Sequence, residues 1–281
     1  MDIKPFKTGK VRDLYDLGSN ILMVASDRIS AFDCVFKETI PSKGIILNSI
    51  SAFFFEYTKD IIDNHMITSK YEKLPPPFNQ NEYFKGRSML VRKIEMLPIE
   101  CVVRGYLEGS GLKEYMKEGC ICKIPLRKGL KQADKLDEPI FTPSIKAEEG
   151  HDLNTSYQET VNIVGAEIAA LLKQKSLELY IKVSEYAMQK GIIIADTKFE
   201  FGILDGKLIL ADEIFTPDSS RFWDIKDYMP GRSQKSFDKQ YLREYLETMG
   251  WNKMPPAPKL TKHVITQTMS KYKEAYERLV K

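Results

Sequence analysis

Several features that would point to particular classes of protein are scarce in this 281-residue chain. Its four cysteines include one close pair, Cys120 and Cys122, but one intervening residue is too short for the usual zinc knuckle and no second pair lies elsewhere. We therefore expect free thiols in a reducing compartment. The net charge is only +3 and no block of five like charges occurs, so the charge pattern gives no reason to expect nucleic acid as a partner.

Long apolar runs are also missing. No stretch approaches the roughly 20 apolar residues that cross a bilayer, and the opening stretch MDIKPFKTGK lacks the apolar centre of a signal peptide. We therefore predict a cytoplasmic protein that does not bind membranes. Apolar residues at 43% and charged residues at 29% are typical of a globular protein with a buried core.

Familiar catalytic and nucleotide-binding patterns are absent as well. No Ser-His-Asp or Cys-His grouping with supporting spacing appears, which leaves hydrolysis through a covalent nucleophile without support. His151 and Asp152 could form an acid/base pair, although an isolated dipeptide of this kind is more often simply exposed. The Walker and dinucleotide-binding glycine patterns are missing. TGKVRDLY nevertheless places Gly9 beside Lys10 and Arg12, two cations expected on one face that can cover phosphates.

Periodicity gives the organisation of the first half of the chain. The first third is predicted to be β-rich, with a hairpin about Gly18 and a helix whose apolar face includes Leu47, Ile50 and Phe54. Two more strands are expected to separate near Pro98. Residues 123–156 show no sustained period and are predicted to form a long loop, which in a compact domain is usually functional or mobile.

The second half begins with an amphipathic helix that ends at Gly191. A β-hairpin is predicted over residues 192–215, because Asp205-Gly206 is a strong turn signal between two apolar runs. Two amphipathic helices near 237–249 and 261–279 complete the chain.

The first strand of that hairpin combines a core face with a charged face. Ile192–Ile194 begin a buried strand, and Asp196, Lys198 and Glu200 then follow at every second position. Side chains alternate along a strand, so these three share one face. A ladder of cross-strand ion pairs on a solvated face is one interpretation. The other is a cleft whose carboxylates bind Mg²⁺ beside phosphate oxygens.

Two polar turns also have both an ordinary and a functional interpretation. TPDSSRFW places Asp218, Ser219 and Arg221 directly after the hairpin, either as a helix-capping turn or as a turn that binds phosphate or carboxylate. VVRGYLEGSG ends a strand with Arg104 and sets Ser110 between two glycines, which also suits a plain surface turn.

Taken together, seven segments resemble the SAICAR synthetase family of purine biosynthesis in their order and spacing. They are GKVRDLY, SDRISAFD, ECVVRGYLEGSG, FTPSIKAEEGHD, ADTKFEFG, ADEIFTPDSSRFW and SFDKQYLREYL. The resemblance runs from Thr8 to about Gly250 and implies a two-lobed α+β fold related to kinase and ATP-grasp architectures. Residues 1–97 would form an antiparallel, β-rich nucleotide-binding lobe. Residues 98–281 would form a larger α/β lobe with the metal and substrate sites, and ATP would lie in the cleft between the lobes.

The resemblance also implies a reaction. The carboxylate of an aminoimidazole ribonucleotide (CAIR) is joined to the amino group of L-aspartate, while ATP becomes ADP and phosphate. Transfer of the γ-phosphoryl group makes the carboxylate electrophilic, and such transfer needs positioning, Mg²⁺ and cations rather than a nucleophilic side chain. The expected partners are these small molecules only, in a monomer or a homodimer.

Roles are carried over residue by residue from the same resemblance. Glu200 and Asp212 would hold Mg²⁺ and thereby contact ATP. The other ATP-binding residues would be Lys10, Arg12, Arg92 and Met96. CAIR would be bound by Arg104, Ser110, His151, Asp218, Ser219 and Arg221. The catalytic residues would be Lys198, Asp196, Lys146 and Asp152. One departure is Leu153 in GHDLN, where the family usually has an acidic residue, and we assign it no role.

Two rival functions remain open at this stage. A small-molecule kinase could share the lobes and the paired metal ligands, and it would form ADP without requiring L-aspartate. A nucleotide-binding or RNA-binding module with a structural role would tolerate loss of the charges of Glu200 and Asp212.

The hairpin carries a geometric prediction. If Asp205-Gly206 alone formed the turn, Glu200 would pair with Ala211, and Asp212 would point to the opposite face from Glu200. A three-residue loop ending at Gly206 would bring both carboxylates to one face. We therefore predict an odd loop or a bulge between Glu200 and Asp212, with both side chains facing the ATP cleft.

Overall fold

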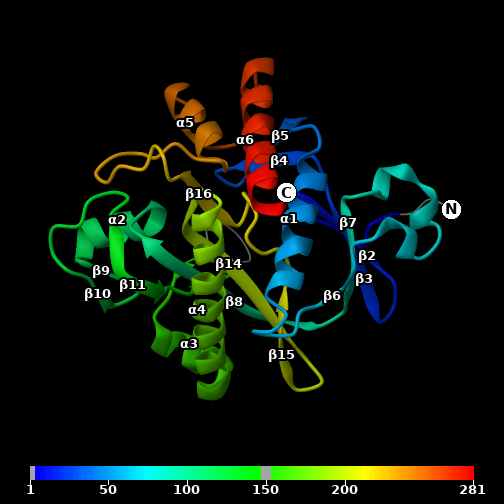
Figure 1. Cartoon of the computed structure of the whole chain (residues 1–281), viewed down its shortest axis with the longest axis horizontal. Helices are drawn as coiled ribbons and strands as arrows, with labels where there is room; N and C mark the ends of the chain where they lie inside the picture. The colour runs from blue at the N-terminus through cyan, green and yellow to red at the C-terminus, as the bar shows by residue number, and fades with distance from the viewer. Residues whose placement is uncertain (1–3, 147–152) are drawn as a thin grey trace.

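The N-terminal third forms a five-stranded antiparallel sheet at one end of the molecule (Figure 1). The computed structural model describes residues 4–146 and 153–281. The predicted hairpin about Gly18 is confirmed, since Leu17 N donates to Asn20 O at 2.9 Å and Gly18 has a φ of 81°. In spatial order the strands are β1 (Lys7–Thr8), β2 (Arg12–Asp16), β3 (Asn20–Ala25), β7 (Ser88–Arg92) and β6 (Met66–Thr68).

A helix and a separate hairpin follow the first strands. Helix α1 (Lys43–Tyr57) buries Leu47, Ile50 and Phe54, so its predicted apolar face is confirmed. Strands β4 (Arg28–Ala31) and β5 (Cys34–Thr39) pair only with each other. The proline-rich connection after β6 holds three single-turn 3-10 helices: η1 (Tyr71–Lys73), η2 (Phe78–Gln80) and η3 (Glu82–Phe84).

A seven-stranded antiparallel sheet forms most of the remaining β structure. The long strands β8 (Glu95–Tyr106) and β14 (Ile192–Leu204) lie side by side at its centre. The other strands are β11 (Lys135–Phe141), β12 (Ser144–Ile145), β13 (Leu153–Asn154), β15 (Lys207–Ala211) and β16 (Ser220–Asp224). A small separate hairpin consists of β9 (Cys120–Ile121) and β10 (Ile124–Pro125).

Two predicted boundaries in this region are wrong. The strands β7 and β8 separate at Lys93–Ile94 rather than near Pro98, which lies inside β8. The pairing of β8 with β14 shifts beside Pro98, between the pairs Glu200/Glu100 and Gly202/Met96, and a proline is tolerated in a strand where the ladder is interrupted. The predicted loop over 123–156 contains β11, whose pairing with β8 supplies the order that its sequence pattern did not reveal.

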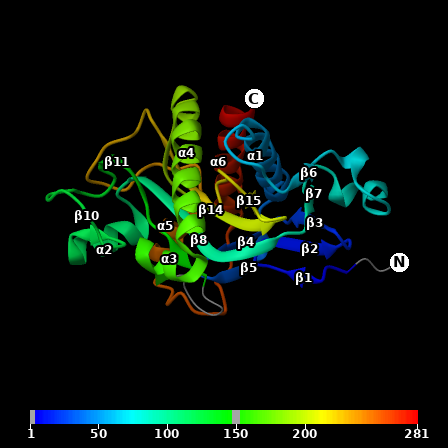
Figure 2. The ribbon, with the colours of Figure 1, turned by 90° about the horizontal axis from the view of Figure 1, so that it is seen from below.

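Helix α4 (Ala166–Gln189) covers one face of the seven-stranded sheet, and α6 (Lys262–Val280) lies beside α1 (Figures 1 and 2). The preceding helix α3 (Tyr157–Val164) begins with a capping box, in which Ser156 and Glu159 satisfy each other's backbone N–H groups. The remaining helices are α2 (Gly109–Glu118) and α5 (Gln240–Thr248). Across residues 4–146 and 153–281, no helix has the length and apolarity to cross a membrane.

The alternation predicted for β14 explains how the fold exposes a charged strip. Phe199 and Phe201 have no exposed surface and join the main core with residues of α1 and α4. The side chains that alternate with them, Lys198 and Glu200, are 34% and 12% exposed and make polar contacts instead. One strand therefore supplies both a core face and a polar face.

Candidate active site

Two arginines share one buried carboxylate on the polar side of the central sheet. Arg104 Nη1 on β8 donates to Asp196 Oδ2 on β14 at 3.0 Å, and Arg221 Nη1 at the start of β16 donates to the same oxygen. Arg104 also contacts Ser110 Oγ at 2.9 Å and Thr142 Oγ1 at 3.0 Å. The structure thus brings together Arg104, Ser110, Asp196 and Arg221, as predicted.

The turn before β16 lies next to this arginine pair. A cavity of about 90 Å³ is lined by residues of the turn together with Asp196, Asp238 and Arg243. Ser219 Oγ accepts from Thr216 N at 3.1 Å within the turn. Asp218 is turned inward, with a side chain only 2% exposed. The predicted helix-capping role is not observed, because β16 rather than a helix follows the turn.

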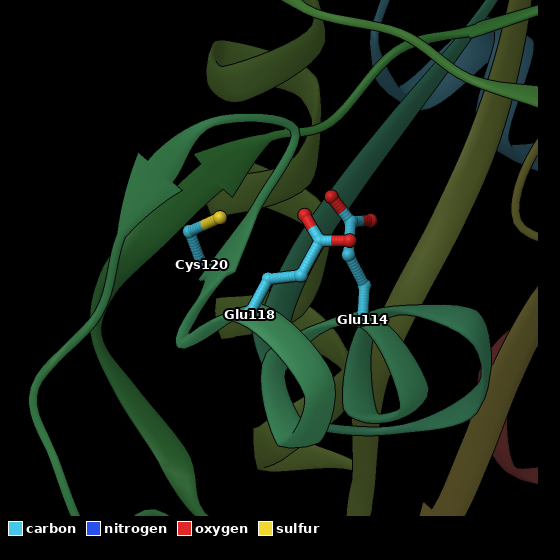
Figure 3. Close-up of side chains that lie close together, drawn as sticks. All are labelled: Glu114, Glu118 and Cys120. Atoms are coloured by element: carbon cyan, nitrogen blue, oxygen red, sulfur yellow. The ribbon is translucent and has the colours of Figure 1, made fainter.

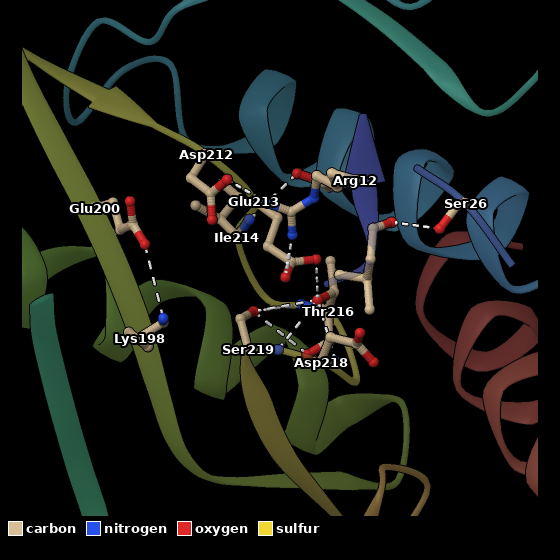
Figure 4. A network of polar contacts seen from close by, with 12 residues as sticks. Arg12, Ser26, Lys198, Glu200, Asp212, Glu213, Ile214, Thr216, Asp218 and Ser219 are labelled. Atoms are coloured by element: carbon tan, nitrogen blue, oxygen red, sulfur yellow. Dashed lines mark hydrogen bonds and ion pairs between the residues drawn. The ribbon is translucent and has the colours of Figure 1, made fainter. Parts of the chain in front are cut away.

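A second polar cluster surrounds Lys198. Its ammonium group lies 3.7 Å from Glu200 Oε1 (Figure 4). It also pairs with Glu100, and Lys146 pairs with Glu200 Oε2. Burial alone would lower the pKa of Lys198, but Glu100, Glu200 and Asp212 raise it above its ordinary value. The lysine therefore remains protonated. Sequence reasoning missed Glu100, which is buried and sits opposite Glu200 in the pairing of β8 with β14.

The predicted odd loop between Glu200 and Asp212 is wrong. Strands β14 and β15 pair without a shift from Glu200/Ala211 to Leu204/Lys207, and Asp205 and Gly206 form a regular two-residue turn. Both turn residues have positive φ, at 50° and 74°, as this kind of hairpin turn requires.

With a two-residue turn, Asp212 was expected to point to the face opposite Glu200. That expectation does not hold, because the alternation of side chains along β15 ends before Asp212. Strand β15 ends at Ala211, and Asp212 adopts a left-handed backbone with a φ of 58°. The charges of Glu200 and Asp212 both raise the pKa of Lys198, so both carboxylates act on one ammonium group. Burial alone would raise the pKa of Asp212, but Arg12 and Lys198 hold it below its ordinary value.

The other predicted ATP-binding residues are dispersed. Arg12 on β2 pairs with both Asp212 and Glu213, linking the two sheets. Lys10 lies in the preceding turn and pairs with Asp33, so it does not share the contacts of Arg12 as their two-residue spacing suggested. Arg92 ends β7 and donates to Asn64 O, and the side chain of Met96 on β8 is 41% exposed. His151 and Asp152 lie outside the described residues.

The Lys198 cluster suits a divalent cation chemically. Its described members comprise four carboxylates, Glu100, Glu200, Asp212 and Glu213, and three cations, Arg12, Lys146 and Lys198. One negative charge is thus in excess. Carboxylate oxygens are ligands that Mg²⁺ prefers.

A different group of possible metal ligands lies at the end of α2. Glu114, Glu118 and Cys120 present ligand atoms within 4.8 Å of one another (Figure 3). Glu114 already accepts from Cys122 N at 2.7 Å and Asn154 Nδ2 at 2.6 Å, and Glu118 pairs with Lys117. These contacts give the side chains a structural role, and we assign no metal there.

Comparison with known proteins identifies the family. The model of the family described as SAICAR synthetase matches residues 5–258. The chain belongs to the SAICAR synthetase family.

Its relatives match over nearly their whole length. The chain is 51% identical over 278 residues to a phosphoribosylaminoimidazole-succinocarboxamide synthase of Thermodesulfovibrio yellowstonii, covering 99% of this chain and 95% of the relative. A protein of the same name from Desulfosudis oleivorans is 54% identical over 276 residues, or 98% and 94% of the two chains.

Solved structures of the family agree with the fold. The SAICAR synthase of Saccharomyces cerevisiae complexed with SAICAR has a TM-score of 0.90 at 40% identity and covers 99% of this chain and 95% of its own. A SAICAR synthetase in complex with ADP has a TM-score of 0.72 at 26% identity, covering 98% and 97%. The predicted family, the mixed α and β fold and the ligase class are therefore confirmed, and the kinase alternative is not favoured.

Proposed function

We propose that the polar side of β8 and β14, with the turn at 216–221, carries the reaction of the SAICAR synthetase family. In this reaction the chain ligates L-aspartate to the carboxylate of CAIR, with ATP as the source of energy and ADP and phosphate as products. The observation that carries the residue assignment is that one strand, β14, contributes to both clusters: Asp196 joins the arginine pair, and Lys198 and Glu200 join the carboxylate cluster.

The arginine pair is the proposed site for the ribose phosphate of CAIR. Two guanidinium groups meet at one carboxylate here, and guanidinium groups match phosphate oxygens in pairs. Within the described residues, Arg221 Nε has no hydrogen-bond partner although it is buried. Ser110 and Ser219 would add hydroxyl groups to the same pocket.

The Lys198 cluster is the proposed site of phosphoryl transfer. Glu200 and Asp212 would hold Mg²⁺, which when bound supplies positive charge beside the phosphates of ATP. Lys198 stays protonated, so its ammonium group can neutralise charge on the CAIR carboxylate as it is activated. Lys146 would act beside it, and His151 and Asp152 remain proposals for the same region.

ATP is proposed to lie between the two sheets. Arg12 joins β2 to the carboxylates after β15, which suits a residue that also meets phosphate. Lys10, Arg92 and Met96 remain proposed ATP contacts, and the division into lobes at 1–97 and 98–281 remains proposed with them. We also propose a cytoplasmic location, with small-molecule substrates as the partners.

An assay of ADP release tests this function directly. We expect ADP formation that requires CAIR, L-aspartate and Mg²⁺ together, because the amine must consume the activated carboxylate for sustained turnover. Reactions that lack each component in turn are the controls. Robust turnover without L-aspartate, or none with all components present, would contradict the ligase.

A glycine beside Arg221 offers a test of the phosphate site. Gly109 has a φ of 60°, and a Cβ there would lie 2.2 Å from Arg221 Nη2. Gly109→Ala should displace the guanidinium and raise KM for CAIR about tenfold, the equivalent of roughly one lost charge-assisted hydrogen bond. KM for ATP should stay unchanged.

Gly119→Ala is the matched control for that variant. Gly119 ends the same helix with a φ of 71°, but a Cβ there meets nothing within 4 Å. Both variants therefore carry similar backbone strain, about 1–2 kcal/mol. Equal KM values for CAIR in the two variants would show that Arg221 does not bind this substrate.

A further inference from the structure

The carboxylate of Asp218 is the centre of a buried polar cluster. Its Oδ2 accepts from Lys43 Nζ at 2.8 Å and forms an ion pair with Lys239 Nζ at 2.9 Å, and its Oδ1 accepts from the Tyr272 hydroxyl at 2.6 Å. The Asp218 side chain is 2% exposed, and Lys43 and Tyr272 have no exposed surface. Both carboxylate oxygens are thus occupied by donors from inside the protein, which leaves Asp218 poorly placed to bind CAIR itself.

The three donors come from separate parts of the fold. Lys43 is the first residue of α1, Lys239 immediately precedes α5, and Tyr272 lies in the middle of α6. The cluster therefore ties the turn at 216–221 to three helices. The other hydrogen bonds of the turn are mainly between its own residues, since Asp218 N and Ser219 N both donate to Thr216 Oγ1 at 3.2 Å.

We propose that Tyr272 is a positioning residue for this turn, acting through Asp218 on Ser219 and Arg221. The inference rests on the proposed function, in which these two residues meet CAIR. Helix α6 begins at Lys262, beyond residue 258 where the family match ends. The C-terminal helix thereby contributes to the site without touching substrate.

The hydroxyl of Tyr272 has a role that the two lysines do not fill. Both ammonium groups bind Oδ2, whereas Tyr272 binds Oδ1. Removal of the hydroxyl takes this donor from Oδ1, and the carboxylate can then rotate towards the lysines and shift the turn. Burial raises the pKa of Tyr272 well above its ordinary value, so the hydroxyl keeps its proton across the range of any assay.

The test compares two Tyr→Phe variants, one at Tyr272 on α6 and one at Tyr186 on α4, whose hydroxyl bonds to α6. In Tyr272→Phe the lost contact is with Asp218, and in Tyr186→Phe it is with Leu279 O on the same helix, at 2.7 Å. Thermal unfolding should show a loss of stability in both variants, and a larger loss in Tyr272→Phe because its lost contact is with a buried carboxylate. Steady-state kinetics with the full-length chain should show KM for CAIR raised about 5- to 10-fold in Tyr272→Phe only, with KM for ATP unchanged.

The outcomes separate cleanly. A rise in KM for CAIR in Tyr272→Phe, with KM for ATP unchanged and neither value altered in Tyr186→Phe, supports the positioning role, because a general loss of stability would affect both substrates. Equal KM values for CAIR in the two variants, or a parallel rise in KM for ATP, would overturn it. Failure of the proposed function is seen separately, as wild-type protein without CAIR-dependent turnover.

Discussion

Asp212→Asn is expected to reduce kcat for ADP formation about 10²- to 10³-fold, the range seen when a preorganised electrostatic contact to the transition state is lost. The amide keeps the shape of the side chain but removes the charge that would hold Mg²⁺. Glu200→Gln should have a similar effect, because its carboxylate lies near the same ammonium group of Lys198. Steady-state kinetics at several Mg²⁺ concentrations give the measurement, and a higher Mg²⁺ requirement should accompany the lower rate.

Glu138→Gln is a suitable control for these variants. Glu138 is exposed on β11, and the same change of charge there should leave kcat unaltered. Asp212 also pairs with Arg12, so the thermal stability of each variant must be measured alongside the rate. Folded variants of Glu200 and Asp212 with the wild-type kcat and Mg²⁺ dependence would show that these carboxylates hold no catalytic metal.

The face of β14 that carries the polar residues could be predicted, because alternation is a local property of a strand. The run of isoleucines fixed the strand, and the charged residues after it fell on one side as expected. The same rule failed one residue beyond β15. Asp212 adopts a left-handed backbone that the sequence pattern does not indicate. The odd loop was predicted because regular strand alternation was assumed to continue through Asp212.

Residues that reach the site through tertiary pairing were harder to predict. Glu100 lies four residues before Arg104 and so shares its face of β8, but its place opposite Glu200 depends on the register of two strands far apart in sequence. Lys43 and Tyr272 meet Asp218 from helices α1 and α6. Each of the two looks locally like an ordinary residue of an amphipathic helix.

The roles of Asp196 and Asp218 show a similar limit. From sequence, both were carboxylates close to the substrate. In the structure Asp196 contacts two arginines, and Asp218 contacts two lysines and a tyrosine. Each carboxylate therefore positions side chains of the protein itself. A sequence motif identifies which residues belong to a site, whereas burial and hydrogen-bond partners indicate whether a residue meets the ligand or supports one that does.

Arg221→Ala is expected to raise KM for CAIR about 10- to 150-fold, which corresponds to the roughly 1.5–3 kcal/mol of one hydrogen bond to a charged group. KM for ATP should remain near the wild-type value. Arg104→Ala should act in the same direction. It should also lower stability more, because Arg104 is 3% exposed and its loss removes a partner from the buried Asp196.

Two further variants make the result interpretable. Arg221→Lys keeps the charge but loses the paired geometry of the guanidinium group, so its KM for CAIR should fall between those of wild type and Arg221→Ala. Arg127→Ala removes an exposed arginine that pairs with Asp137, and it should leave both KM values unchanged. If KM for ATP rose instead, while KM for CAIR held steady, the arginine pair would have to be reassigned to the nucleotide. If Arg104 and Arg221 bind the phosphate of CAIR, their loss must weaken the binding of CAIR before that of ATP. The reason is that neither arginine contacts the carboxylate cluster around Lys198 in any described ion pair.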